Sequence, residues 1–229
     1  MRGWWRELGS LVLPTSCAGC GGARTVLCAP CRGLLSAGPA RRVRPVPEPP
    51  GLPPVYAAVA YADQARAVLL AHKERGVLSL AGPLGRALAV SARAAAAVPG
   101  VDGAVLSLVP VPSSRAAVAR RGHDPVRRIA LAAAGWLRRD GLPVRVRPVL
   151  RQRRRVADQA GLTAGQRAAN LTGALVVRPG ALLAGDVVLL VDDLLTTGVS
   201  LAEAARAVRS SGGRPVGAAV VAGPPIGWT

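Results

Sequence analysis

The stretch Val187-Val-Leu-Leu-Val-Asp-Asp-Leu-Leu-Thr-Thr-Gly-Val-Ser200 decides how the rest of this chain is interpreted. Its first five residues are all apolar, which is typical of a strand buried on both faces of a parallel sheet. The apolar run ends at two carboxylates, Asp192 and Asp193, and a turn rich in hydroxyls and glycine follows. We expect a helix to begin after this turn, because Ser200 and Glu203 have the spacing of a capping box. A strand, a polar turn and a helix N-terminus together form a natural anion site.

The two adjacent carboxylates narrow the class of ligand. A site that binds only phosphate gains no affinity from two carboxylates. A site that binds a sugar phosphate does, because carboxylates accept hydrogen bonds from vicinal hydroxyls. A magnesium ion on a second phosphate group would offset the charge repulsion. The stretch also lacks the lysine that a P-loop carries after its last glycine. A sugar phosphate is therefore the expected ligand, and an ordinary strand–helix turn with acidic residues is the alternative.

The same stretch resembles the 5-phosphoribosyl-1-pyrophosphate (PRPP) binding signature of type I phosphoribosyltransferases. The resemblance implies that Asp192 and Asp193, the candidate catalytic residues, contact the ribose 2′- and 3′-hydroxyls. It also implies that the following turn wraps the 5′-phosphate, with contacts from Thr196, Thr197, Gly198 and Ser200. Ser200 cannot fully serve both the phosphate and the helix cap, so these two expectations compete.

Composition and net charge limit the size of the domain and the classes of ligand that the protein can bind. A chain of 229 residues suits one medium domain with a small appendage, and half of its residues are hydrophobic. The formal net charge is +18, and Lys73 is the only lysine. Such a basic surface attracts polyanions, which include nucleic acid, anionic membranes and phosphorylated metabolites. We find no membrane span or export signal in the sequence and expect a cytoplasmic protein.

All four cysteines lie in two Cys-x-x-Cys pairs that are separated by seven residues. Two such turns complete a tetrahedral zinc site, and four thiolates would close it, so that the metal holds a fold together and does not catalyse. Two disulfides or a redox pair are the alternatives. A reducing cytoplasm and the lack of a thioredoxin-like pattern argue against both. We therefore expect structural zinc bound by Cys17, Cys20, Cys28 and Cys31.

A run of prolines divides the chain. We expect a zinc-binding N-terminal module over residues 1–45, a proline-rich linker over 46–54 and a phosphoribosyltransferase-like domain over 55–229. From Val55 onward strands alternate with helices, which indicates an α/β fold with a parallel sheet whose ligands bind at the carboxyl ends of the strands. Strands are predicted at 55–61, 104–109, 144–150, 173–177 and 217–222, and helices at 63–75, 80–97, up to about residue 137, and 163–170.

Two further segments are predicted to reach the ligand. The turn at 110–115 leaves its strand at the same edge of the sheet and would hold a second anion, such as pyrophosphate, through Pro112, Ser113 and Arg115. A simple proline turn is the alternative. The basic segment 151–163 is predicted to be a mobile loop that brings arginines, Arg155 among them, to the leaving pyrophosphate. A basic surface loop that touches nucleic acid is the alternative.

The order of these pieces resembles the ComF family of competence-associated proteins. The resemblance covers nearly the whole chain, and it places Lys73 and Arg155 among the substrate-binding residues. Its supporting elements are Lys73 with Gly76, the Val-Pro-Val-Pro turn at 109–112, Arg121-Gly122, the segment from Arg155 to Asn170, and the stretch from Asp192 to Ser200. The family usually continues Arg-Gly with an aromatic residue and then Asn-Gln, whereas this chain has His123, Asp124 and Pro125. This departure leaves the acceptor specificity open, and the sequence assigns no role to His72 or His123.

Two functions follow from these observations. The first is a phosphoribosyltransferase that transfers a phosphoribosyl group from magnesium-bound PRPP to an unidentified acceptor and releases pyrophosphate. The second is a nonenzymatic factor of competence and DNA uptake that binds single-stranded DNA or a helicase partner. An aromatic content of 3% argues against a platform on which bases stack. A third possibility is a zinc-stabilised domain whose ligand site has lost its function.

Overall fold

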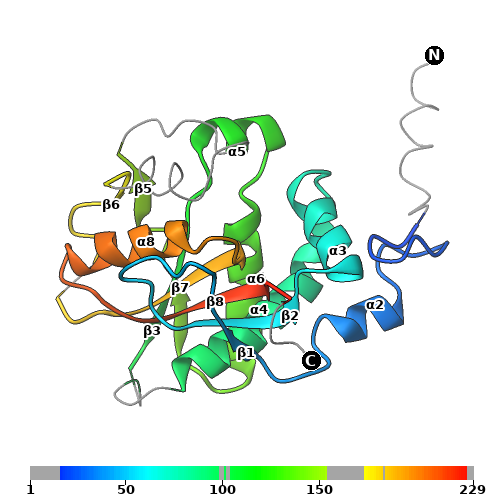
Figure 1. The fold of residues 1–229 in the computed structure, drawn as a ribbon, viewed down its shortest axis with the longest axis horizontal. Coiled ribbons are helices and arrows are strands. Elements are labelled where there is room, and N and C mark those ends of the chain that lie inside the picture. The colour runs from blue at the N-terminus through cyan, green and yellow to red at the C-terminus, as the bar shows by residue number, and fades with distance from the viewer. Residues whose placement is uncertain (1–15, 98–100, 102–103, 154–172, 183, 226–229) are drawn as a thin grey trace.

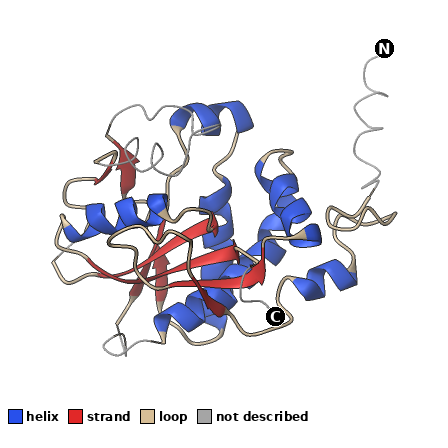
Figure 2. Ribbon diagram, viewed as in Figure 1, coloured by secondary structure: helices blue, strands red, loops and turns tan. Residues whose placement is uncertain are grey.

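A six-stranded sheet with helices on both faces forms the centre of the molecule (Figures 1 and 2). The computed structural model describes residues 16–97, 101, 104–153, 173–182 and 184–225. The strands run in the order β1-β2-β8-β7-β3-β4, and every neighbouring pair is parallel except β1 with β2. The predicted α/β fold is therefore confirmed. The strands are β1 (Arg41–Val43), β2 (Val55–Ala60), β3 (Leu106–Pro110), β4 (Val144–Val146), β7 (Val187–Leu194) and β8 (Arg214–Gly223).

Each face of the sheet has its own apolar core. Helices α3 (Asp63–Lys73), α4 (Ala81–Ala96) and α6 (Pro125–Arg139) pack in one cluster, and α8 (Val199–Arg209) packs in the other. Small side chains let the helices approach closely: a Cβ added at Gly85 of α4 would overlap the side chain of Ala132 in α6. The short helix η2 (Leu78–Leu80) leads directly into α4.

The winding of the chain reverses between β3 and β7. Strand β3 continues through α5 (Arg115–Arg121) and α6 to β4 on one side, whereas β7 continues through α8 to β8 on the other. These two strands are hydrogen-bonded neighbours, and Pro110 pairs with Val191 at their carboxyl ends. In open parallel sheets ligands bind at such a reversal, outside the carboxyl ends of the strands. Asp192 and Asp193 stand at this reversal, so the topology favours a ligand site there.

The prediction of one strand over 144–150 is wrong. The segment contains β4 and the first residue of a separate strand, β5 (Leu150–Gln152), which pairs antiparallel with β6 (Leu175–Val177) in a small second sheet. Pro148 lies between them and has no N–H for the ladder of the main sheet, so the chain leaves that sheet there. The predicted loop at 151–163 thus begins in a strand, and the predicted helix at 163–170 lies outside the described residues.

The segment around the cysteines packs directly on the main core. Cys17, Leu27, Cys31 and Leu35 are buried in the same cluster as α3, and α2 (Ala29–Leu34) lies beside that helix (Figure 1). Strand β1, which falls inside the predicted module 1–45, joins the main sheet as an antiparallel edge strand. The domain boundaries at 45 and 54 stay a prediction. Within the part of the chain that the structure describes, no helix is long and apolar enough to cross a membrane.

Candidate active site

A cavity of about 510 Å³ opens at the carboxyl ends of β3 and β7. It brings together most of the residues that the sequence predicted. Lys73 reaches it from α3, and Pro112 and Ser113 come from the turn after β3. All the predicted residues of the 192–200 stretch, which runs from the end of β7 to the start of α8, line it as well: Asp192, Asp193, Thr196, Thr197, Gly198 and Ser200. Arg155 lies outside the described residues.

The two aspartates of β7 have different partners. The Nζ of Lys73 lies 2.7 Å from Oδ2 of Asp193, which is only 4% exposed. The backbone N–H of Asp193 donates to Oδ1 of Asp192 at 2.8 Å. Asp193 is thus tied to a cation, while the half-buried carboxylate of Asp192 lines the cavity.

The close packing of these charges changes the proton affinity of Asp192 and Lys73. Burial, together with the adjacent Asp193 carboxylate, raises the pKa of Asp192 well above its usual value. Burial alone would lower the pKa of Lys73, but the two carboxylates outweigh it and the pKa of this amine is raised. Lys73 is therefore a permanent cation at neutral pH, and further positive charge at the cavity would favour the ionised form of Asp192.

Helix α8 presents an open N-terminus to the cavity. Its N-cap is Gly198, which adopts a left-handed conformation with φ of 74° and forms no side-chain cap. By contrast, Ser114 caps α5 by accepting from the N–H of Ala117, and Asp124 caps α6 in the same way from Arg127, both at 3.1 Å. The first N–H groups of a helix lack partners within it, and here no side chain at the N-cap takes them. They are available to an anion in the cavity.

The predicted capping box of Ser200 and Glu203 is therefore wrong. The helix starts at Val199, so Ser200 is its second residue and lines the cavity. Glu203 is buried and accepts the N–H of Leu175 in β6 at 2.9 Å, together with two bonds from the Arg206 guanidinium at 2.8 Å. Burial alone would raise the pKa of Glu203, but these donors outweigh it and lower the pKa. Glu203 joins α8 to the small sheet instead of capping the helix.

The turn after β3 has few free donors. The N–H of Val111 donates to the carbonyl of Val191, and Pro112 has no N–H. The N–H groups of Ser113 and Ser114 are the ones the turn can direct at a ligand. Arg115 is exposed and does not line the cavity, so its predicted contact stays a prediction.

The sequence missed several residues that line the cavity: Arg120 and Arg121 at the end of α5, and Gln152 of β5. It missed the arginines because the helix that carries them has only seven residues. The spacing from Ser114 to Gly122 was the available signal. Ser114 caps the helix, and Gly122 ends it in the left-handed conformation with φ of 72°. The side chain of Arg121 is further fixed by Glu74, with its Nε 3.0 Å from Oε2 of that residue.

The four cysteine sulfurs lie within 4.8 Å of one another. Cys28 Sγ is 3.6 Å from the sulfur of Cys17 and 3.7 Å from that of Cys20. Ligands about 2.3 Å from a tetrahedral zinc ion are about 3.8 Å apart, whereas a disulfide needs about 2.05 Å. The donor set and spacing fit zinc, and all four thiols are free.

Backbone donors prepare one of these thiols for a metal. Burial alone would raise the pKa of Cys17, but the N–H groups of Cys28, Cys20 and Gly19 outweigh it and lower the pKa to about 6. Burial and the three neighbouring sulfurs raise the pKa of Cys31 to about 12. Without a cation the cluster therefore retains a proton on Cys31, which a metal would displace. Gly19 fits tightly here, since an added Cβ would lie 2.8 Å from the Cys31 sulfur.

Comparison with known proteins identifies the domain. Residues 116–229 match the model of the phosphoribosyl transferase domain, and no curated protein matches the chain. The matched segment includes β7, the 192–200 stretch and α8. Strands β2 and β3 precede it, yet they pair with β8 and β7 and complete the same sheet. The chain therefore contains a phosphoribosyltransferase domain, with a four-cysteine cluster near its N-terminus.

Proposed function

We propose that the protein is a phosphoribosyltransferase that binds PRPP in this cavity and transfers its phosphoribosyl group to an acceptor, releasing pyrophosphate. The observation that carries the proposal is the uncapped N-terminus of α8 beside the paired carboxylates of β7. A sugar phosphate needs both features together, because its phosphate takes the helix N–H groups and its hydroxyls donate to carboxylates. Both lie within the segment that matches the domain model.

Different residues of the cavity would contact different parts of PRPP. The 5′-phosphate would take the backbone donors of residues 196–200 with the hydroxyls of Thr196 and Thr197. Asp192 and Asp193 would accept from the ribose hydroxyls. The pyrophosphate would lie toward Lys73, the Ser113 turn and the arginines at the end of α5, where positive charge collects.

Magnesium would accompany the ligand. Phosphate oxygens and the Asp192 carboxylate are the oxygen ligands that Mg²⁺ prefers. The bound ion would supply charge neutralisation on the pyrophosphate oxygens. Its positive charge would also oppose the raised pKa of Asp192, so that this carboxylate is ionised when it accepts from a hydroxyl.

The transfer replaces one bond at C1 of the ribose with another. The acceptor lone pair forms a bond to C1 while the bond from C1 to the pyrophosphate oxygen breaks, and its electron pair leaves with pyrophosphate. The ribose gains oxocarbenium character on the way, as in glycosyl transfer generally. The protein contributes by orienting the sugar through Asp192 and Asp193 and by placing Lys73 and Arg121 near the leaving group. A proton carried by the acceptor would pass to solvent or to the departing group.

Calorimetric titration with Mg²⁺ and PRPP tests the proposal. The double variant Asp192→Asn/Asp193→Asn should lose binding by at least about 100-fold, the scale of two charge-assisted hydrogen bonds. The matched control is Asp140→Asn, which removes an exposed carboxylate paired with Arg93 at the far end of α6. The proposal fails if the unaltered protein does not bind PRPP, or if the double variant binds as tightly as the control. Pyrophosphate release with a panel of nucleobases and amines would then identify the acceptor.

We also propose that the cysteine cluster holds one structural zinc ion. The spacing of the sulfurs and the lowered pKa of Cys17 support it. The cluster packs against α3, the helix whose last residue is Lys73, so the metal would support one wall of the cavity from a distance. The resemblance to the ComF family stays a prediction.

A further inference from the structure

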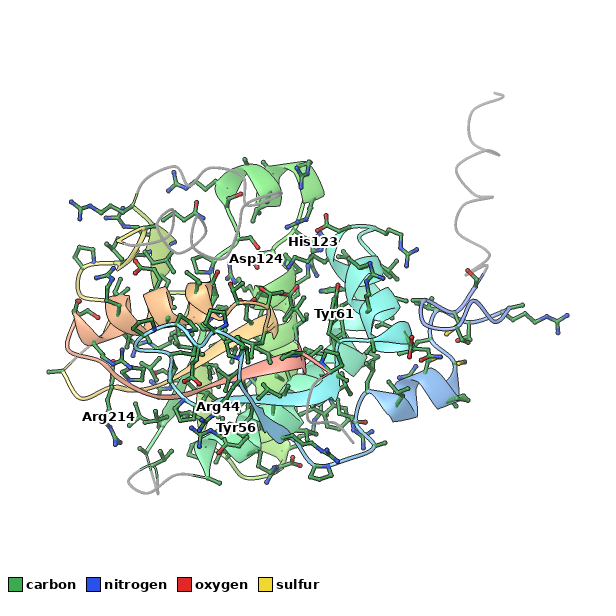
Figure 3. All side chains as sticks on the ribbon, in the orientation of Figure 1. Arg44, Tyr56, Tyr61, His123, Asp124 and Arg214 are labelled. Carbon is green, nitrogen blue, oxygen red and sulfur yellow. The ribbon has the colours of Figure 1, made fainter. Side chains whose placement is uncertain are left out.

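Two histidines lie buried beside the cavity without a role in the reaction described above. His72 is completely buried on α3, and His123 is 7% exposed in the turn between α5 and α6. Their ring centroids are 5.7 Å apart in an edge-to-face arrangement. Figure 3 shows His123 beside Asp124 in the region between α3 and the start of α6. We refer to these two residues as the histidine pair.

All four ring nitrogens of the pair face backbone carbonyl oxygens. Nδ1 of His72 is 3.3 Å from the carbonyl of Val77, and its Nε2 is 3.4 Å from that of Pro125. The corresponding distances for His123 are both 3.1 Å, from Nδ1 to Arg121 and from Nε2 to His72. A neutral imidazole has one donor, whereas an imidazolium has two. His123 makes the two shorter contacts of the pair, and at least one of its ring nitrogens carries an N–H to donate.

The two carbonyls that His123 contacts belong to the walls of the cavity. One is the carbonyl of His72, the residue before Lys73, and the other is that of Arg121, which lines the cavity. Glu74, the residue after Lys73, pairs with the side chain of Arg121. His123 therefore connects the backbone at the end of α3 with the end of α5, and the Glu74–Arg121 ion pair closes the same connection from the solvent side, since Glu74 is 42% exposed.

We propose that His123 is a positioning residue that fixes Lys73 and Arg121 against the cavity through the contacts of its ring nitrogens with the carbonyls of His72 and Arg121. The inference rests on the proposed function only for the identity of the ligand, because the contacts are those of the free protein. If the His123 ring is lost, the backbone at the end of α3 loses its link to the end of α5, and the Glu74–Arg121 ion pair remains. The amine of Lys73 then spends less time on Asp193.

Charged groups surround the pair on several elements. Lys73 ends α3 and Glu74 follows it, Arg121 comes from α5, Asp124 from the turn and Asp193 from β7. Burial and the nearby His123 lower the pKa of His72.

The single lysine of the chain makes the test direct. Reaction of Lys73 with an amine-directed reagent, followed by mass spectrometry of its peptide, reports how long the amine stays on Asp193. We expect His123→Phe, which keeps a ring but has no donor, to react roughly threefold to tenfold faster than the unaltered protein, the scale of one hydrogen bond. His123→Gln, which keeps an amide group that can donate, should fall between them. Arg127→Gln removes one exposed positive charge next to the turn and should react at the unaltered rate.

The amide variant separates positioning from general packing. His123→Gln restores a donor without an aromatic ring, so it should react more slowly than His123→Phe, whereas a ring that only fills space would make His123→Gln react at least as fast as His123→Phe. An unaltered rate in His123→Phe, or a His123→Gln rate no lower than that of His123→Phe, overturns the proposal. Should His123→Phe fail to fold, His123→Leu, which also has no donor, takes its place.

Labelling in the presence of ligand distinguishes the proposed function from the proposed role of His123. Mg²⁺ with PRPP should slow the labelling of Lys73 in the unaltered protein, and should do so at higher concentrations in His123→Phe. Absence of this protection counts against the proposed function, while the rates of the free proteins still decide the role of His123. Protection that is equal in both proteins counts against the positioning of Lys73.

Discussion

Replacing Lys73 with methionine should destabilise the protein strongly and in a pH-dependent way. The variant leaves the carboxylate of Asp193, 4% exposed, without its cation and next to Asp192. Two unit charges 2.7 Å apart interact by roughly 6 kcal/mol at an effective dielectric constant of 20, which is an upper bound. The Lys73 side chain is 31% exposed, and solvent screening reduces this figure. We expect a loss of about 2–3 kcal/mol in the free energy of unfolding at pH 8, somewhat below the range for fully buried pairs.

The loss should shrink as the pH falls. Without Lys73 the two aspartates share no cation, and one of them binds a proton more tightly in the folded than in the unfolded protein. A raised folded pKa of a carboxyl means that acidification favours the folded state, so Lys73→Met should lie closer to the unaltered protein at pH 5 than at pH 8. The double variant Lys73→Met/Asp193→Asn removes both charges and should recover most of the stability.

Urea unfolding followed by tryptophan fluorescence measures these free energies, and a double-mutant cycle isolates the coupling between the two residues. Trp136 on α6 is a probe in the described part of the chain, where the guanidinium groups of Arg86 and Arg139 lie over its ring. The reasoning is refuted if Lys73→Met costs less than about 0.5 kcal/mol, or if the double variant is no more stable than the single one.

Three further changes have defined outcomes. Gly198→Ala should lower stability by about 1–2 kcal/mol, because φ is 74° and the new Cβ would lie 3.0 Å from Leu52, and should weaken PRPP binding in calorimetry. Glu203→Gln should lower the free energy of urea unfolding at pH 7; because the folded pKa of Glu203 is lowered, the difference from the unaltered protein should hold above about pH 5 and close as the pH falls below about 4. If the two proteins still differ at pH 3 by the same free energy of unfolding as at pH 7, the lowered pKa of Glu203 is contradicted. Metal analysis should find one zinc per chain, and a chelator or Cys28→Ser should lower the melting temperature; equal melting with and without metal would rule out a structural ion.

Much of the site could be predicted because it lies in one continuous stretch. The apolar run of β7, the two aspartates and the glycine turn are adjacent in sequence, and local chemistry fixes their order in space. The cysteine spacing was informative for the same reason. Contacts between distant segments carried no such signal. The pairing of Lys73 with Asp193 joins α3 to β7, which are far apart in the sequence, and neither residue type demands the other.

The errors arise where the conformation of a single residue or a long-range contact overrides the local sequence pattern. Ser200 and Glu203 have the spacing of a capping box, but Gly198 can adopt the left-handed conformation and starts the helix one residue before Ser200. Glu203 then finds Arg206 and the N–H of Leu175, a residue 28 positions earlier in the chain. Likewise Pro148 splits a segment of alternating valine and arginine that periodicity alone joins into one strand.

The central position of β8 has a consequence for how the protein is made. Strand β2 hydrogen-bonds to β8 along its length, although more than half the chain separates them, and β8 also pairs with β7. On the ribosome, residues 55–60 emerge long before their partner has been synthesised, and only the three residues of β1 can pair with them in the meantime. The sheet can therefore close only after residue 223 has left the exit tunnel, and non-local pairing of this kind is slow. Nascent chains should need protection of that exposed strand edge until translation is nearly complete.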